Sequence, residues 1–120
     1  MAIDESSLIV LSTNIIALGD PTEPQGDEGL IDLLTGSYVN DATVELEVLL
    51  HLATNTTVTG FTPPLAMAYL PGSNGVYRAE LSASIADNII VRNAYDVSIR
   101  ATAIGGTVKV FSKRLWAERG

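Results

Sequence analysis

Hydrophobic and polar residues alternate most regularly near the end of the chain, where residues 93–110 read NAYDVSIRATAIGGTVKV. Hydrophobic or small residues occupy one parity and polar residues the other: Tyr95, Val97, Ile99, Ala101 and Ala103 against Asp96, Ser98, Arg100 and Thr102. A period of two predicts a β-strand with one face in the core and the other in solvent. The stretch therefore predicts the first strand of a β-hairpin.

The pair Gly105-Gly106 predicts the turn of this hairpin, because glycine readily adopts the positive φ angles of a two-residue type I′ turn. With such a turn, Val108 and Val110 face the core again, whereas Phe111 has the opposite parity. Two interpretations remain open for the second strand. Either a bulge shifts its register or Phe111 faces outward.

Residues 42–50, ATVELEVLL, form another alternating stretch. Its inward parity holds Ala42, Val44, Leu46, Val48 and Leu50, and its outward parity holds Thr43, Glu45 and Glu47. We expect a half-buried strand with an acidic outer face. Paired carboxylates can act as general acid and base, but a solvated sheet face explains Glu45 and Glu47 without any such chemistry.

A second hairpin is predicted at residues 65–83, where turn residues from Pro71 to Gly75 separate two apolar runs. In its second strand, Tyr77, Ala79 and Leu81 have the inward parity. The following connection, SIADNIIVRN at residues 84–93, predicts a short helix capped by Ser82 or Ser84. The chain thus contains about six or seven short strands without long helical periodicity, which predicts an all-β antiparallel sandwich or barrel.

The first part of the chain follows this pattern poorly. Residues 8–18, LIVLSTNIIAL, are apolar at both parities and predict one strand covered on both faces, by its own sheet or by another subunit. Residues 19–29, GDPTEPQGDEG, predict a loop. LIDLL at residues 30–34 fits either a short strand or one helical turn ended by Gly36, and we favour the strand. We therefore expect an N-terminal strand or arm with an acidic loop at 1–29 and a β-sandwich at 30–120.

Composition and charge narrow the class of protein. A chain of 120 residues with 47% hydrophobic and 18% charged residues predicts one folded domain. No export signal is recognised in MAIDESSLIV, and the apolar runs are shorter than the ~18–20 residues that span a bilayer. The net charge of −7 argues against binding to nucleic acid. We expect folding in a cytoplasm, with no membrane or nucleic-acid partner.

Candidate chemistry is sparse. The single histidine, His51, has the outward parity of its strand and is expected to be a surface or strand-end residue. The chain has no cysteine, no nucleophile elbow of the form G-x-S-x-G and no phosphate-binding loop. Calcium binding would draw on the carboxylates of Asp20, Glu23, Asp27, Glu28 and Asp32, but their spacing is irregular. We expect no enzyme activity, no cofactor and no metal.

Several motifs together resemble a known family. Tyr95 stands two residues before the inward Val97 and directly after a long connection, as a tyrosine does near the start of one strand in immunoglobulin-like sandwiches. The stretch LIDLLTGSYVNDATVELEVL, the strand SNGVYRAEL and the final hairpin YDVSIRATAIGGTVKVFSKRLWAE follow one another in the same order as in that family. Residues 30–118 resemble immunoglobulin-like virion proteins encoded among head and tail genes of tailed bacteriophages and prophages.

The resemblance implies an immunoglobulin-like antiparallel β-sandwich of about seven strands. It implies a structural virion protein, assembled in the host bacterial cytoplasm, that decorates the capsid or lies at the head–tail junction. Its partners would be other virion proteins, of the capsid or neck, and copies of itself. The alternative function is an immunoglobulin-like binding module that recognises carbohydrate or a cell-surface protein, for which tyrosine and tryptophan exposed in loops would be the signal.

Two groups of residues are candidates for the protein–protein contact. The first is an apolar N-terminal group, which consists of Ile9, Leu11, Ile15 and Ile16. The second is a C-terminal group of aromatic and basic residues, which consists of Phe111, Lys113, Arg114 and Trp116. Aromatic residues and arginine are enriched at protein interfaces. The competing interpretation places the aliphatic residues in the core and the basic residues on a solvated surface.

Overall fold

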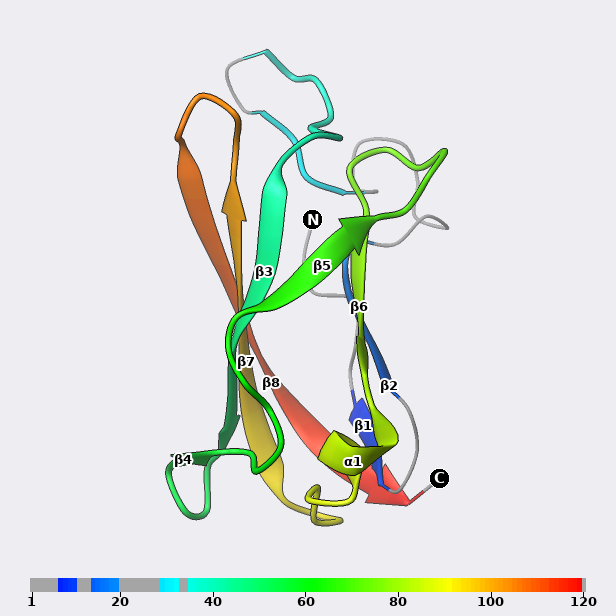
Figure 1. The fold of residues 1–120 in the computed structure, drawn as a ribbon, viewed down its shortest axis with the longest axis vertical. Helices are drawn as coiled ribbons and strands as arrows, with labels where there is room; N and C mark the ends of the chain where they lie inside the picture. The colour runs from blue at the N-terminus through cyan, green and yellow to red at the C-terminus, as the bar shows by residue number, and fades with distance from the viewer. Residues whose placement is uncertain (1–6, 11–13, 20–28, 33–34, 120) are drawn as a thin grey trace.

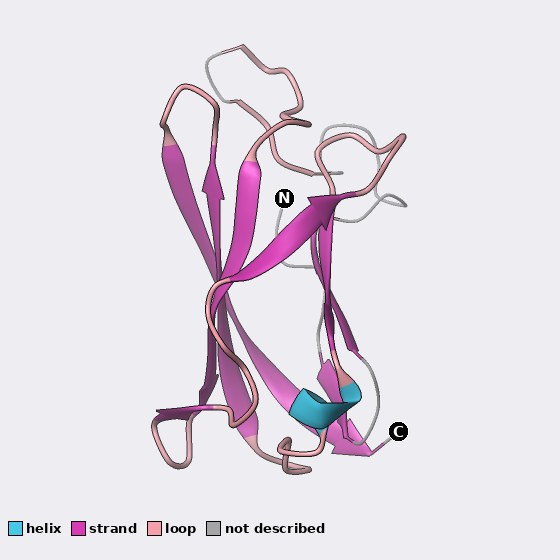
Figure 2. Cartoon of the chain, in the orientation of Figure 1, coloured by secondary structure: helices cyan, strands magenta, loops and turns pink. Residues whose placement is uncertain are grey.

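The computed structural model describes residues 7–10, 14–19, 29–32 and 35–119 (Figures 1 and 2). In order, the elements are β1 (Ser7–Val10), β2 (Asn14–Leu18), β3 (Thr43–His51), β4 (Thr56–Thr57), β5 (Leu65–Tyr69), β6 (Tyr77–Leu81), α1 (Ala83–Ala86), β7 (Ala94–Thr102) and β8 (Val108–Arg119). Seven strands form one curled sheet in the order β1-β8-β7-β3-β5-β6-β2, and β4 pairs with the end of β3. The prediction of an all-β fold is confirmed.

The sheet folds into two layers because β5 belongs to both of them. Its first residues, Leu65–Met67, pair with β3, whereas Ala68 and Tyr69 pair with β6. Figure 1 shows β5 crossing diagonally from the layer of β3, β7 and β8 to the layer of β6 and β2. The two layers enclose the core, whose largest fully buried side chains are Tyr77, Tyr95, Ile16, Leu18, Leu46, Leu49, Leu81, Ile99 and Leu115.

Tyr95 forms a tyrosine corner at the start of β7, an arrangement in which the hydroxyl of a buried tyrosine hydrogen-bonds to the backbone a few residues upstream. The backbone N–H of Ile90 donates a hydrogen bond to the Tyr95 hydroxyl at 2.8 Å, and Tyr95 and Val97 are fully buried. With β2 paired to β6 in one layer and β3, β7 and β8 joined in the other, the fold is a β-sandwich. The alternation predicted for β7 is confirmed along its length, since Ile99 and Ala101 are buried as well.

The N-terminal prediction is wrong in one respect. Residues 8–18 form two strands instead of one: β1 runs parallel to β8, and β2 runs antiparallel to β6. No single alternation continues through this segment because it is divided between the two layers. Both strands are part of the sandwich, so the expected boundary after residue 29 does not separate an arm from the domain. At the short strand expected for residues 30–34, the described residues 30–32 form an isolated bridge, from Ile31 to Tyr38, and no strand.

The hairpin between β7 and β8 has a three-residue loop, Ile104–Gly106, in place of the predicted two-residue turn. The Ala103 N–H donates to the Thr107 carbonyl and the Gly106 N–H donates to the Ala103 carbonyl, each at 2.8 Å, and Gly106 has a φ of 93°. This is the common turn in which a residue with positive φ forms a bulge. The extra residue pairs Thr102 with Val108 and Ile99 with Phe111.

This shift reverses the faces expected for β8. Val108 and Val110 are exposed, whereas Phe111 packs against the core and Leu115 is fully buried. The prediction that Val108 and Val110 face the core is therefore wrong. Of the two interpretations left open for Phe111, the shifted register is the correct one.

A second one-residue shift occurs in β3, at a bulge between Leu46 and Val48. The predicted alternation holds up to Leu46, which is fully buried. Beyond the bulge, Leu49 is fully buried and Val48 is 36% exposed, so the prediction that Val48 and Leu50 face the core is wrong. The predicted hairpin of β5 and β6 and the short helix α1 after Ser82 are both confirmed. Ser82 lies at the N-cap position, but its side chain makes no capping hydrogen bond, so the predicted capping is wrong.

Candidate docking surface

The two register shifts bring apolar residues onto the outer side of one sheet. We use the name outer sheet face for the outward-facing residues of β3, β7 and β8: Glu45, Val48, Leu50, Asp96, Ser98, Arg100, Thr102, Val108, Val110, Ser112, Arg114 and Trp116. Cross-strand pairs fix their positions, with Arg100 opposite Val110 and Ser98 opposite Ser112. The middle of this face is formed by the outward-facing residues of β7, which alternate along the strand with buried residues.

The outer sheet face holds most of the large hydrophobic residues that are exposed in the described part of the chain. Six large hydrophobic residues are exposed in the described part of the chain, and four of them lie on this face: Val48, Val108, Val110 and Trp116. Val110 is 52% exposed and Trp116 is 54% exposed. These residues alternate with serine and arginine side chains on the same side of the sheet. An exposed apolar side of a sheet is a candidate surface for binding another protein.

Two ion pairs place arginine side chains among these apolar residues. Arg100 Nε lies 2.6 Å from Glu47 Oε1, and Arg114 Nε lies 3.1 Å from Asp96 Oδ1. Both pairs are partly exposed to solvent, so each stabilises the fold by only about 0–1 kcal/mol. Their main effect is to orient the guanidinium groups across the face. Arginine and tryptophan are the residue types most enriched at the energetic centres of interfaces.

The C-terminal candidates from the sequence are separated by the structure. Arg114 and Trp116 lie on the outer sheet face, whereas Phe111 and Lys113 have the opposite parity and are half-buried. The Lys109 ammonium lies 5.6 Å from the centre of the Phe111 ring, which keeps this ring covered. Only two of the four residues are therefore placed to contact a partner together.

The N-terminal candidates are placed as follows. Ile16 is fully buried in the domain's own core, so its predicted role in an interface is wrong and the core interpretation holds. Ile9 and Ile15 lie on β1 and β2, where their backbones pair with Glu118 and Glu80. Leu11 lies outside the described residues. For Ile9, Leu11 and Ile15 the interface role stays a prediction.

Sequence reasoning missed four residues of the outer sheet face as interface candidates: Val48, Val108, Val110 and Arg100. The three valines were assigned to the core because an apolar residue at an alternating position is normally buried. The opposite parity of Phe111 was the signal that could have found Val108 and Val110. If the aromatic Phe111 is placed inward, both valines must face outward.

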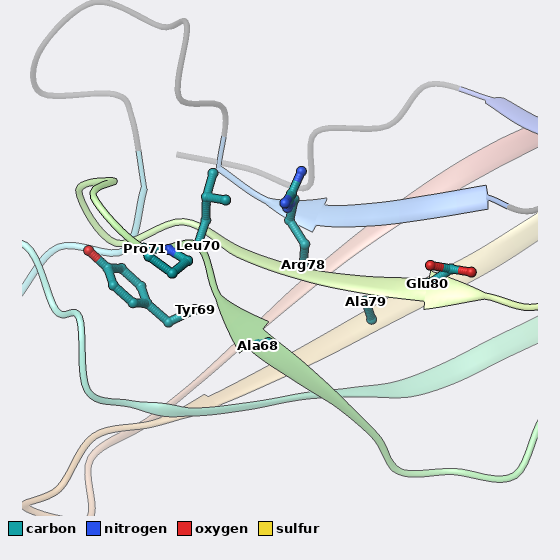
Figure 3. A pocket seen from close by; sticks show the side chains of 7 residues that line it. All are labelled: Ala68, Tyr69, Leu70, Pro71, Arg78, Ala79 and Glu80. Atoms are coloured by element: carbon teal, nitrogen blue, oxygen red, sulfur yellow. The ribbon is translucent and has the colours of Figure 1, made fainter.

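A hollow of about 330 Å³ lies where β5 and β6 diverge (Figure 3). The two strands pair only at Ala68–Arg78 and Tyr69–Tyr77. Figure 3 shows Arg78 and Ala79 pointing to opposite sides of β6, as expected for neighbours on a strand. The side chains that line the hollow therefore do not converge on a common point, and the hollow is a consequence of the separation of the two strands.

His51 lies at the end of β3 and supports the tyrosine corner. Its ring stacks on Tyr95 with the ring centres 4.9 Å apart. Its Nε2 atom lies 3.3 Å from Asn93 Oδ1, and its Nδ1 atom lies 3.2 Å from Thr54 Oγ1. The predicted strand-end position is confirmed, but the predicted outward parity is wrong, because the β3 bulge turns His51 toward Tyr95.

The described residues form neither a cluster of metal ligands nor a helix that could span a membrane. These residues contain no group of three or more histidine, cysteine or acidic side chains arranged around a common point. Asp20, Glu23, Asp27 and Glu28 lie outside the described ranges, so the calcium hypothesis is not tested by the structure. None of the helices in the described part has the length and apolar character needed to cross a bilayer.

The segment before β3 is fixed to the core by Tyr77. This buried hydroxyl donates to the Val39 carbonyl at 2.6 Å and accepts from the Ala42 N–H at 3.2 Å. Burial raises the pKa of Tyr77 above its ordinary value of 10.0, and the Ala42 hydrogen bond acts in the opposite direction. The neutral phenol thus links the β6 strand to the start of β3, which carries one edge of the outer sheet face.

The raised pKa of Tyr77 predicts alkaline loss of stability. The unfolded chain ionises this tyrosine near pH 10 and the folded chain ionises it at higher pH, so the stabilisation is complete below about pH 10 and is lost above it. We expect Tyr77→Phe to lower the free energy of unfolding by about 1–3 kcal/mol at pH 8 and to weaken its dependence on pH above 10. Urea unfolding of both proteins between pH 8 and 11.5 measures this; equal pH dependence in the two would contradict it.

Comparisons with protein-family models, with characterised proteins and with solved structures yield no match for this chain. The fold and the surface define its class: an all-β sandwich whose outer sheet face exposes apolar and arginine side chains.

Proposed function

We propose that this chain is a structural protein of the virion of a tailed bacteriophage or prophage, and that it binds other virion proteins through the outer sheet face. The observation that carries the docking function is the concentration of exposed apolar side chains on that face, with Trp116 and Val110 as its most exposed members. The assignment to a virion, at the capsid surface or the head–tail junction, is supported by the resemblance of residues 30–118 to proteins of that family.

The construction of the outer sheet face suits binding. Its residues lie on three paired strands, and the opposite sides of these strands carry the fully buried Leu49, Ile99 and Leu115. A surface on a rigid sheet loses little conformational entropy when it is bound. The apolar residues contribute burial, and the ion-paired Arg100 and Arg114 contribute polar contacts with a defined direction.

The size of the face indicates how stable attachment is reached. From Val108 to Trp116, β8 extends about 27 Å at ~3.4 Å per residue, and three strands are about 15 Å wide. This footprint of about 400 Å² is roughly half of the ~800 Å² that each partner buries in a standard interface. One such contact is weak, and stable attachment through it requires that bound copies also be linked to one another, because avidity arises only between linked binding sites.

The alternative function, recognition of carbohydrate or a cell-surface protein, has less support in the described residues. Its expected signal was tyrosine and tryptophan exposed in loops. Trp116 lies within β8, Tyr77 and Tyr95 are buried, and Tyr38 and Tyr69 are half-buried.

The virion assignment is tested by quantitative mass spectrometry of purified particles from the bacterium or phage that carries the gene. We expect this chain in the particles at a fixed ratio to the major capsid protein, and we expect the ratio to be the same after repeated purification. Recovery of the chain only from the soluble fraction of the lysate would contradict the proposal.

A further inference from the structure

One end of the molecule carries both a protruding apolar side chain and an apolar hollow. The β7–β8 hairpin and the segment that leads into β3 lie together at this end of the long axis (Figure 1). Ile104, in the hairpin loop, is 79% exposed. Beside it, a hollow of about 260 Å³ is lined by apolar residues such as Leu30, Val39 and Ala101, with Asp32 and Lys109 among its charged residues.

We propose that Ile104 of one copy enters this hollow on a second copy, in a reciprocal two-fold contact. In its own chain Ile104 stays exposed although its neighbour Ala103 and the nearby Thr107 line the hollow, so the space is left for another side chain. Full burial of an isoleucine stabilises a contact by about 1.5–3 kcal/mol. The loop is held by the hydrogen bonds from Ala103 to Thr107 and from Gly106 to Ala103, so little order is gained on binding.

The charged residues of the hollow favour a second copy as the occupant. Asp32 belongs to the segment before β3, and Lys109 belongs to β8, so they come from the two different elements that form the hollow. In a two-fold contact, a pairing of Asp32 in one copy with Lys109 in the other occurs twice. Asp32 of each copy then faces Lys109 of the other, and two attractive pairs form at once.

This contact joins copies of the chain and does not depend on which virion protein the outer sheet face binds. Val108 borders both surfaces, so the tests use Ile104, Asp32 and Lys109, which are not part of the outer sheet face. A defect in self-association is thereby distinguished from a defect in docking.

Sedimentation equilibrium of the full chain, from micromolar to millimolar concentration, tests the contact. We expect the wild-type protein to form dimers at high concentration and Ile104→Asp to raise the dissociation constant at least tenfold. Ile90→Asp is the matched control, because Ile90 is 52% exposed in the connection at the opposite end of the molecule. A wild-type protein that stays monomeric, or dimers that persist unchanged in Ile104→Asp, would overturn the proposal.

A charge exchange tests the pairing itself. Asp32→Lys and Lys109→Asp are each expected to weaken dimerisation several-fold, because each places like charges opposite one another. The double variant is expected to recover the wild-type dissociation constant within about threefold, and a mixture of the two single variants is expected to form heterodimers. Failure of both the double variant and the mixture to recover binding would contradict the two-fold arrangement.

Discussion

Replacement of Leu49 by alanine is expected to lower the free energy of unfolding by about 2–5 kcal/mol, the range for large-to-small changes in a protein core. Replacement of the adjacent Val48 is expected to lower it by less than about 1 kcal/mol, as for most surface positions. The difference arises because the bulge in β3 turns Leu49 into the core and leaves Val48 partly exposed on the outer sheet face.

Urea unfolding followed by circular dichroism measures both variants, and each serves as the control for the other. Without the bulge, regular alternation from Leu46 would bury Val48 and expose Leu49. A larger loss of stability in Val48→Ala than in Leu49→Ala would therefore contradict the register of β3 and, with it, the composition of the outer sheet face.

Those parts of the fold that depend on local pattern were predictable from the sequence. Local sequence, within a few residues of each element, was enough to predict three features. These are the alternation in β7, the inward Tyr77 and Leu81 of β6, and the short helix after Ser82. The tyrosine corner at Tyr95 was also predictable, because its hydrogen bond reaches back only five residues, to Ile90.

The N-terminal strands were not predictable in the same way. β1 pairs with the last strand of the chain, and β2 pairs with β6, so both pairings join residues far apart in the sequence. A local apolar run indicates that a strand is buried, but it does not indicate which strand covers it. The division of residues 8–18 between two layers therefore depends on long-range contacts.

The candidate site was missed for a related physical reason. A one-residue shift in a strand exchanges its two faces, yet it leaves the local alternation unchanged. Such shifts occur at Glu47 and at the Ile104–Gly106 loop, and they move Val48, Val108 and Val110 to the outside. A protein core and a surface that binds a partner contain the same types of apolar residue. Residue type alone therefore does not show whether a given valine is buried in the core or exposed on such a surface.

Substitution of Trp116 is expected to have the largest effect on docking. Trp116→Ala removes the largest exposed side chain of the outer sheet face and is expected to weaken binding at least ~30-fold, as at the energetic centre of an interface. The fold should be unaffected, because more than half of the side chain is exposed. Ile90→Ala, at an exposed position outside the face, is the matched control and is expected to bind as the wild-type protein does.

The central claim is that the outer sheet face attaches this chain to the particle. It is tested most directly by replacing the gene with wild-type, Trp116→Ala or Ile90→Ala forms and counting copies of the chain per purified particle by mass spectrometry. The account predicts equal copy numbers for the wild-type and Ile90→Ala proteins and at least a tenfold lower number for Trp116→Ala at equal expression. Equal incorporation of all three proteins would contradict it.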